Sequence, residues 1–166
     1  APVGDPIPTP ELSLKASGIG PIIHGMSLAD AAGRLVASFG EPDAAGLDLD
    51  ICPSSELYWL QWGDFRALFD GYTDGASFVA YRYERTGTTS AGPELETLSG
   101  IRLGDTVEAF QSTYVAFTIS FEVMNDRNYF KLSNGGELLL WGPVTSTEPR
   151  GTIEGVYSPD SCETDG

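Results

Sequence analysis

A short stretch that occurs twice is the feature that most constrains the fold of this chain. The first copy spans residues 22–31 (IIHGMSLADA) and the second spans residues 101–110 (IRLGDTVEAF). Each copy has an apolar lead-in, a glycine, a residue suited to cap a helix and the start of an amphipathic helix. Residue 22 corresponds to residue 101, and the same offset of 79 residues relates the glycines and the capping hydroxyls. A constant offset indicates duplication of one structural unit.

Both copies predict a helix. In the first copy, Ser27 is expected to cap a helix that ends near Gly40, because Pro42 cannot continue it. Its apolar residues recur with the spacing of one helical stripe: Leu28, Ala31, Ala32, Leu35, Val36 and Phe39. In the second copy, Asp105 or Thr106 is expected to cap the helix. Its apolar face is Val107, Phe110 and Tyr114.

Strand-forming runs follow each predicted helix and are separated by turn sequences such as Gly63-Asp64. The acidic residues 40–55 are expected to form a loop. Since a helix must cover one face of an antiparallel meander, the fold class is α+β. We expect two tandem helix-plus-meander repeats that share one sheet, with both helices on one face. The expected strands are residues 57–62, 65–69, 77–83, 117–124, 129–132, 137–141 and 152–157.

The chain divides into a linker at 1–17, a first repeat at 18–84, a connector at 85–95 and a second repeat with an acidic tail at 96–166. The first ten residues are rich in proline and resemble what remains after a signal peptide or a lipid-anchored leader is removed, although a trimmed chain would begin in the same way. We therefore expect an extracellular or cell-surface protein.

Cys52 and Cys162 are expected to form a disulfide, as exported proteins commonly do. Their spacing does not match a zinc site, whose ligands come in close pairs. In the chain-entropy model the disulfide contributes about 4–5 kcal/mol, and it ties the end of the chain to the first repeat.

The chain is strongly acidic, with 24 acidic and 9 basic residues and a net charge of -15. Such a surface repels phosphate, so no nucleic acid is expected as a partner. The chain contains no apolar run of the length, about 18 residues, that a membrane span needs. We interpret the excess of acidic residues as a means of keeping the protein soluble. The alternatives are a cationic partner or a salty habitat.

Gly25-Met26-Ser27 before the first helix and Gly40-Glu41-Pro42 after it form a pattern found in known families. It resembles the repeat of secreted beta-lactamase inhibitory proteins and the small lipoprotein of the outer-membrane barrel assembly machinery. The tandem copy is more similar to the inhibitory proteins. A closer similarity, carried by residues 100–105 and by Tyr157 to Cys162, is to uncharacterised secreted or lipid-anchored actinobacterial proteins.

The resemblance covers most of residues 18–162. It implies an extended antiparallel sheet with helices on one face and a concave protein-binding face on the other. The inhibitory proteins carry a disulfide within each repeat, whereas this chain has one cysteine in each half. Their inhibitory loops have no match here, so no inhibitory residue is carried over.

His24 is the only histidine and lies near Ser27. A hydrolytic triad with Ser27 or Ser54 needs a positioned acid and an oxyanion hole, and the chain has no nucleophile-elbow motif. The second copy has Leu103 at the equivalent position, so we expect a structural or surface histidine. Residues 18–20 (GIG) lack the other features of a phosphate loop and are expected to form a turn.

Asp43, Asp48 and Asp50 are hard oxygen ligands of the kind that calcium prefers. Because the EF-hand spacing is absent, we expect a solvated acidic loop, and no metal or other cofactor. A glycosidase-type pair of carboxylates is an open alternative, since the separation of such a pair is a spatial property.

Aromatic residues on the predicted strands are candidates for a binding surface, because Tyr and Trp bury a large area at low entropic cost. The candidates are Trp59, Trp62, Tyr81 and Tyr83. Trp59 and Trp62 point to opposite faces of their strand, so at least one of the four is expected in the core. Core packing of the whole set is the alternative.

These features favour a secreted or surface-tethered, non-enzymatic binding module that recognises a protein or a cell-envelope component. An inhibitor of an extracellular enzyme is one form of this function. One alternative is a small-molecule binder or hydrolase with a pocket between the repeats. Another is a structural envelope protein.

Overall fold

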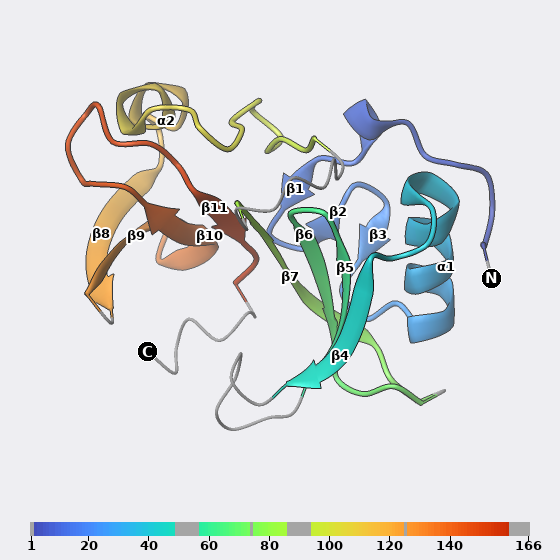
Figure 1. Ribbon diagram of the computed structural model, residues 1–166. Coiled ribbons are helices and arrows are strands. Elements are labelled where there is room, and N and C mark those ends of the chain that lie inside the picture. Colours follow the sequence, from blue (N-terminus) through green and yellow to red (C-terminus); the bar gives the residue numbers. More distant parts are fainter. Residues whose placement is uncertain (1, 49–56, 74, 86–93, 125, 160–166) are drawn as a thin grey trace.

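The described part of the chain forms an eight-stranded antiparallel sheet with two α-helices and a small three-stranded sheet beside it (Figure 1). The computed structural model describes residues 2–48, 57–73, 75–85, 94–124 and 126–159. The expected α+β class is confirmed. In chain order the elements are a 3-10 turn (Thr9–Glu11), β1 (Leu14–Lys15), β2 (Gly18–Ile19), β3 (Ile22–Ile23), α1 (Leu28–Phe39), β4 (Ala44–Asp48), β5 (Leu57–Trp62), β6 (Phe65–Phe69), β7 (Phe78–Glu84), α2 (Val107–Thr113), β8 (Thr118–Met124), β9 (Arg127–Asn134), β10 (Glu137–Val144) and β11 (Gly155–Tyr157).

The strands of the large sheet lie in the order β4-β5-β6-β7-β11-β10-β9-β8. The four strands that follow α1 therefore form one half of the sheet, and the four that follow α2 form the other. The halves meet where β7 pairs with β11 through three residue pairs, one of which is Arg82 with Tyr157. The two outermost strands, β4 and β8, are the edges of the sheet.

Both helices begin at the predicted capping residues. The Ser27 hydroxyl accepts a hydrogen bond from the Asp30 N–H at 3.2 Å, and the Thr106 hydroxyl accepts one from the Ala109 N–H at 3.0 Å. Each side chain thus satisfies one of the backbone donors that a helix start leaves without a partner. The predicted caps are confirmed.

The glycine before each cap attaches the helix start to the sheet. Gly25 and Gly104 have φ angles of 95° and 93°, in the left-handed region that favours glycine. The Gly25 N–H donates to the Phe78 carbonyl, and the Gly104 N–H donates to the Ile153 carbonyl, both at 2.8 Å. Each helix start is therefore bonded to the backbone at, or just before, the last strand of its own half.

The core lies between the helices and one face of the large sheet. Ala31 and Leu35 of α1 and Val107 and Phe110 of α2 are buried there, as their apolar spacing predicts. The other α1 stripe residues are partly buried against the same cluster. Residues outside the helices complete it: Leu12, Leu14, Ile19, Ile22, Leu60, Trp62, Phe65, Ala67, Phe69, Phe78, Tyr81, Tyr83, Leu95, Ile101, Tyr114, Phe130, Leu132, Leu140, Val144, Ile153 and Val156.

Two expectations about local structure are wrong. Residues 44–48, expected to be a loop, form β4 and pair with β5 through five residue pairs. This segment has little intrinsic strand preference, so pairing with the aromatic β5 determines its conformation. Gly18 and Ile19, expected to form a turn, form β2 and pair with both β1 and β3.

Some expectations fall on residues outside the described ranges. They are the disulfide between Cys52 and Cys162, the positions Asp50 and Ser54, and most of the connector at 85–95.

Removing either capping hydroxyl is expected to destabilise the protein. We expect Ser27→Ala and Thr106→Ala each to lower the free energy of unfolding by about 1 kcal/mol, measured by urea denaturation. Thr147→Ala, at an exposed position, is the control and should change stability by less than about 0.5 kcal/mol. Equal stability of all three variants would contradict the capping roles.

The buried Tyr81 phenol predicts alkaline sensitivity. Burial raises the pKa of Tyr81 well above its ordinary value of 10.0, so its contribution is fully present below pH 10.0 and is lost as pH rises toward the folded-state pKa. The Tyr81 hydroxyl also donates to the Lys15 carbonyl at 2.9 Å. We expect Tyr81→Phe to cost about 1 kcal/mol at neutral pH and to make the alkaline loss of stability shallower.

Unfolding curves measured from neutral pH to above pH 10 test this expectation. Tyr72→Phe is the control, because the Tyr72 side chain is 62% exposed. Indistinguishable alkaline slopes for the two variants would contradict the role given to Tyr81.

Candidate functional site

Three of the four candidate surface residues lie in the core. Trp62, Tyr81 and Tyr83 are 2%, 0% and 5% exposed, so the expectation that they form a surface is wrong. Strand alternation turns all three toward the main core. Their polar atoms form hydrogen bonds within the protein. Trp62 Nε1 donates to the Gly40 carbonyl, the Tyr81 hydroxyl donates to the Lys15 carbonyl, and the Tyr83 hydroxyl accepts from the Leu95 N–H. The expectation that at least one of the four is in the core is confirmed.

Trp59 lies on the opposite side of the sheet, which we call the second face. Its ring packs so closely over Gly46 of β4 that a Cβ there would come within 2.8 Å of the ring. A small apolar cluster surrounds it, made of Leu57, Leu68, Ala80 and Val79. Trp59 is therefore the one predicted candidate that lies outside the main core.

A row of residues at paired positions crosses the second face. Side chains at directly paired positions point to the same side of a sheet, so the strand register brings together residues that are far apart in the chain. From β5 to β9 the row is Gln61, Arg66, Arg82, Tyr157, Trp141 and Lys131. We call this set the second-face row.

Arginine side chains of the row stack on aromatic rings. The Arg66 guanidinium carbon lies 4.1 Å from the centroid of the Trp59 ring, and that of Arg82 lies 4.5 Å from the Tyr157 ring and 5.7 Å from the Trp141 ring. Each stacked pair at a half-exposed site contributes on the order of 0.5–1 kcal/mol. The stacking fixes both guanidinium groups in place.

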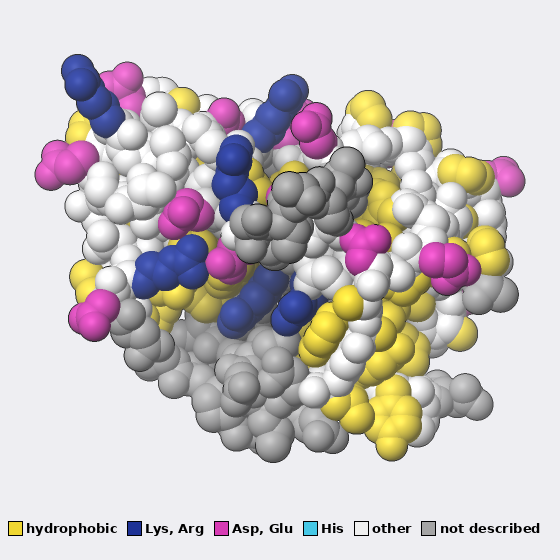
Figure 2. Space-filling view, viewed as in Figure 1, with side chains coloured by type: hydrophobic (Ala, Val, Ile, Leu, Met, Phe, Trp, Pro, Cys, Tyr) yellow, Lys and Arg dark blue, Asp and Glu magenta, His cyan; other side chains and the backbone are white. Residues whose placement is uncertain are grey.

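Arg66 and Arg82 are directly opposite each other on neighbouring strands. Like charges in this position destabilise a sheet. They border a cavity of about 210 Å³ whose other lining residues are Gln61, Asp64 and Glu84. Figure 2 shows Lys and Arg side chains around a hollow near the middle of the molecule. The cavity is thus lined by charged and polar side chains of the first half.

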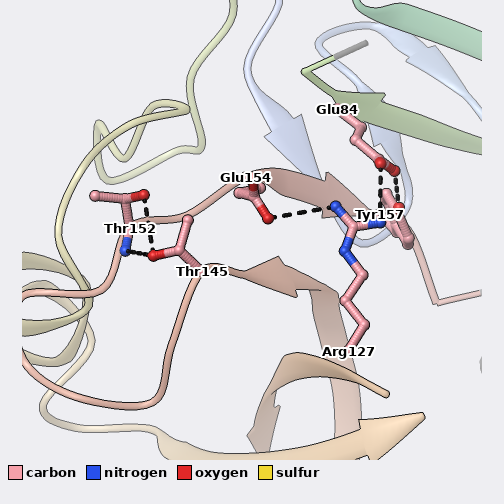
Figure 3. Close-up of polar contacts among 6 residues, drawn as sticks. All are labelled: Glu84, Arg127, Thr145, Thr152, Glu154 and Tyr157. Atoms are coloured by element: carbon pink, nitrogen blue, oxygen red, sulfur yellow. Dashed lines mark hydrogen bonds and ion pairs between the residues drawn. The ribbon is translucent and has the colours of Figure 1, made fainter. Parts of the chain in front are cut away.

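The Glu84 carboxylate connects the two halves (Figure 3). It accepts a hydrogen bond from the Tyr157 hydroxyl and forms an ion pair with Arg127 at 3.2 Å. Arg127 also contacts Glu154 at 3.4 Å. Partial burial lowers the pKa of Arg127, but the charge and hydrogen bond of Glu84 outweigh it, so the pKa lies above its ordinary value.

The centre of the second face is closed and its flanks are more open. Trp141 and Tyr157 are 3% and 2% exposed and meet edge to face with centroids 4.7 Å apart. The Trp141 Nε1 donates to the Ser158 carbonyl at 3.1 Å. Trp59 and Arg66, by contrast, are half-buried. The flank formed by β5 and β6 is therefore more accessible than the centre of this face.

The other sequence candidates have structural contacts. The His24 ring packs edge-on against Phe78 with centroids 5.0 Å apart, and the nearby Ser27 hydroxyl is the helix cap. The Asp43 carboxylate accepts from the Gly63 N–H at 2.6 Å and so supports the β5–β6 turn. Among the described residues, no group of three or more His, Cys, Asp or Glu is placed to hold a metal ion.

Comparisons with known proteins do not assign this chain to a family. No protein-family model matches it, and no curated protein or solved structure shows significant similarity. In the part of the chain that the structure describes, neither helix is long and apolar enough to cross a membrane.

Sequence reasoning missed the residues that make the second-face row. Trp141 and Tyr157 lie in predicted strands. Alternation along each strand puts Arg66 and Arg82 on the opposite face of the sheet from the buried aromatic residues next to them. The missing information was the register between strands. It is set by close contacts such as the one between Gly142 and the Gly155 carbonyl, which sequence patterns do not reveal.

The Glu84–Arg127 contact is expected to couple the halves energetically. Both side chains are partly exposed, at 27% and 38%, so we expect a coupling of about 0.5–1 kcal/mol. A double-mutant cycle with Glu84→Gln and Arg127→Gln, measured by urea unfolding, gives this value. The Lys131–Glu122 pair, at 2.7 Å within one half, is the control cycle. If the effects of Glu84→Gln and Arg127→Gln on the free energy of unfolding simply add, the energetic link between the halves is contradicted.

Proposed function

We propose that this protein is a non-catalytic binding module that recognises a partner protein through the second face of its sheet. The observation that supports this most is the second-face row with its flanking Trp59. Trp, Tyr and Arg are the residues most enriched where protein interfaces concentrate their binding energy. In this chain Trp59, Arg66 and Arg82 are half-buried on three neighbouring strands of the face. Tyr157 and Trp141 are buried beside them and stack against Arg82.

The arginines of the second face favour a partner with acidic groups. Four of the chain's nine basic residues lie on this face: Arg66, Arg82, Arg127 and Lys131. Arg127 and Lys131 form ion pairs with Glu84 and Glu122, so the contact proposed here involves Arg66 and Arg82, which stack on aromatic rings. Guanidinium groups bind carboxylates with two parallel hydrogen bonds. Since Arg66 and Arg82 border one cavity, a partner carboxylate inserted there is the contact that we propose.

We further propose that the module acts outside the cell or at its surface, where a protein or another envelope component meets it. An inhibitor of an extracellular enzyme is one form of this function.

We also propose that the two halves are copies of one unit. The support is the equivalent placement of their helix starts. The bridge between Ser27 and Ser77 in the first half corresponds to the bridge between Thr106 and Thr152 in the second. Each half is a helix followed by four strands.

A second candidate function is the binding of a small anionic molecule. The cavity at Arg66 and Arg82 supports it, and this cavity lies within the first half rather than between the halves. A small dicarboxylate that fits there would raise the melting temperature, and the rise would grow with the logarithm of its concentration above the dissociation constant.

Capture experiments test the protein-binding proposal. Immobilised wild type, Trp59→Ala and Arg66→Ala are incubated with secreted and envelope proteins of the source organism, and captured proteins are identified by mass spectrometry. The affinity of the captured partner is then measured by calorimetry. We expect each variant to weaken binding by about 2 kcal/mol, or roughly 30-fold.

Arg102→Ala is the matched control, because Arg102 is a 67% exposed arginine with its own ion pair to Glu96. It should bind like the wild type. Circular dichroism confirms that all variants are folded. A partner held equally by the wild type, Trp59→Ala and Arg66→Ala would overturn the assignment of the second face.

A further inference from the structure

The edge strand β8 presents backbone groups with no neighbouring strand among the described residues. It lies at one end of the sheet order and pairs with β9 alone, through seven consecutive residue pairs without a register shift. In an antiparallel pair, alternate residues direct their N–H and C=O groups away from the partner strand. One side of β8 is therefore a template for another strand.

Proteins usually protect such an edge with proline, charged residues, a bulge or a short strand. The β8 sequence, TISFEVM, contains no proline and one charged residue, Glu122. That charge is already paired with Lys131 at 2.7 Å. The opposite edge, β4, is shorter and contains Gly46 and Asp48. Of the two edges, β8 is the one that lacks protection.

Exposed apolar side chains gather in and just before β8. Val115, Phe117 and Val123 are 82%, 37% and 67% exposed. The β8–β9 hairpin, residues 118–134, is also neutral in sum: it contains two acidic residues, Glu122 and Asp126, and two basic residues, Arg127 and Lys131. In a chain with a net charge of -15, this edge is a place where a second copy can approach with little local repulsion.

The strand is also complementary to itself. If two copies of β8 pair antiparallel about Phe121, Ile119 of one lies opposite Val123 of the other, and the two Phe121 residues face each other. Ser120 then lies opposite Glu122, so the two carboxylates do not meet directly. Aromatic and β-branched cross-strand pairs each contribute on the order of 0.2–1 kcal/mol.

We propose that β8 is a self-association edge, through which two copies of this chain form a symmetric dimer with one continuous sheet. The two-fold axis places both second faces on the same side of that sheet. An interface of one strand from each copy is small, so the dimer is weak and dependent on concentration. The net charge of each copy opposes it at long range, so salt strengthens it.

Sedimentation velocity over a range of protein and salt concentrations tests the proposal. We expect a reversible dimer of twice the 17.7 kDa chain mass. Its dissociation constant should fall as NaCl rises from about 0.01 M to about 1 M, because the Debye length shortens from about 30 Å to about 3 Å. Val123→Lys, which places a charge in the paired region, should raise the dissociation constant by about tenfold or more.

Two lysine variants at other exposed apolar positions are the controls. Leu98→Lys, at a site that is 71% exposed, carries the same charge change outside β8 and should dimerise like the wild type. Leu47→Lys, on β4, should do the same. Hydrogen exchange of the wild type provides a measurement that needs no variant. Within residues 118–124, the amides that point away from β9 should exchange more slowly as protein concentration rises.

A protein that stays monomeric at every salt and protein concentration overturns the proposal. So does a dimer that Val123→Lys leaves intact, or that Leu47→Lys disrupts instead. These outcomes do not depend on the second face, so the dimer and the proposed binding function can fail independently.

Discussion

The antiparallel pairing of β7 with β11 is the contact on which the rest of the structure depends. It joins two four-stranded halves into one sheet through only three residue pairs. The helix starts are hydrogen-bonded to the backbone at or just before these two strands, so the pairing also places both helices over one core. Tyr157 opposite Arg82 makes the second-face row continuous. A slip of one residue would move Tyr157 into the core and expose Val156.

Charge is distributed unevenly over the large sheet. The chain as a whole is acidic, yet the second face combines arginines with aromatic rings and with a few paired carboxylates. Arg66 and Arg82 stand opposite each other despite their like charge, and stacking on Trp59 and Tyr157 offsets part of that cost. The edge at β8 is the other region where acidic residues do not outnumber basic ones. The two proposals use these two regions separately.

A self-associating edge and a recognition face on one sheet have a combined consequence. If both proposals hold, a dimer through β8 would present two second faces on the same side, and a partner with repeated sites would be bound with avidity without any new contact. A monomer would bind the same partner through one face only. Protein concentration and salt would then regulate binding strength without any change in the site itself.

The sequence by itself determined the local elements. The spacing of apolar residues placed both helices, the hydroxyls of Ser27 and Thr106 placed their caps, and the aromatic runs placed β5, β6 and β7, because these signals act between near neighbours in the chain. Tertiary structure alone decided which aromatic residues are buried, that residues 44–48 form a strand, and that Arg66, Arg82, Trp141 and Tyr157 share a face. Those features depend on register and on contacts between distant segments, such as Gly46 beneath Trp59. Periodicity carries no information about which strand pairs with which, and the second face exists only through that pairing.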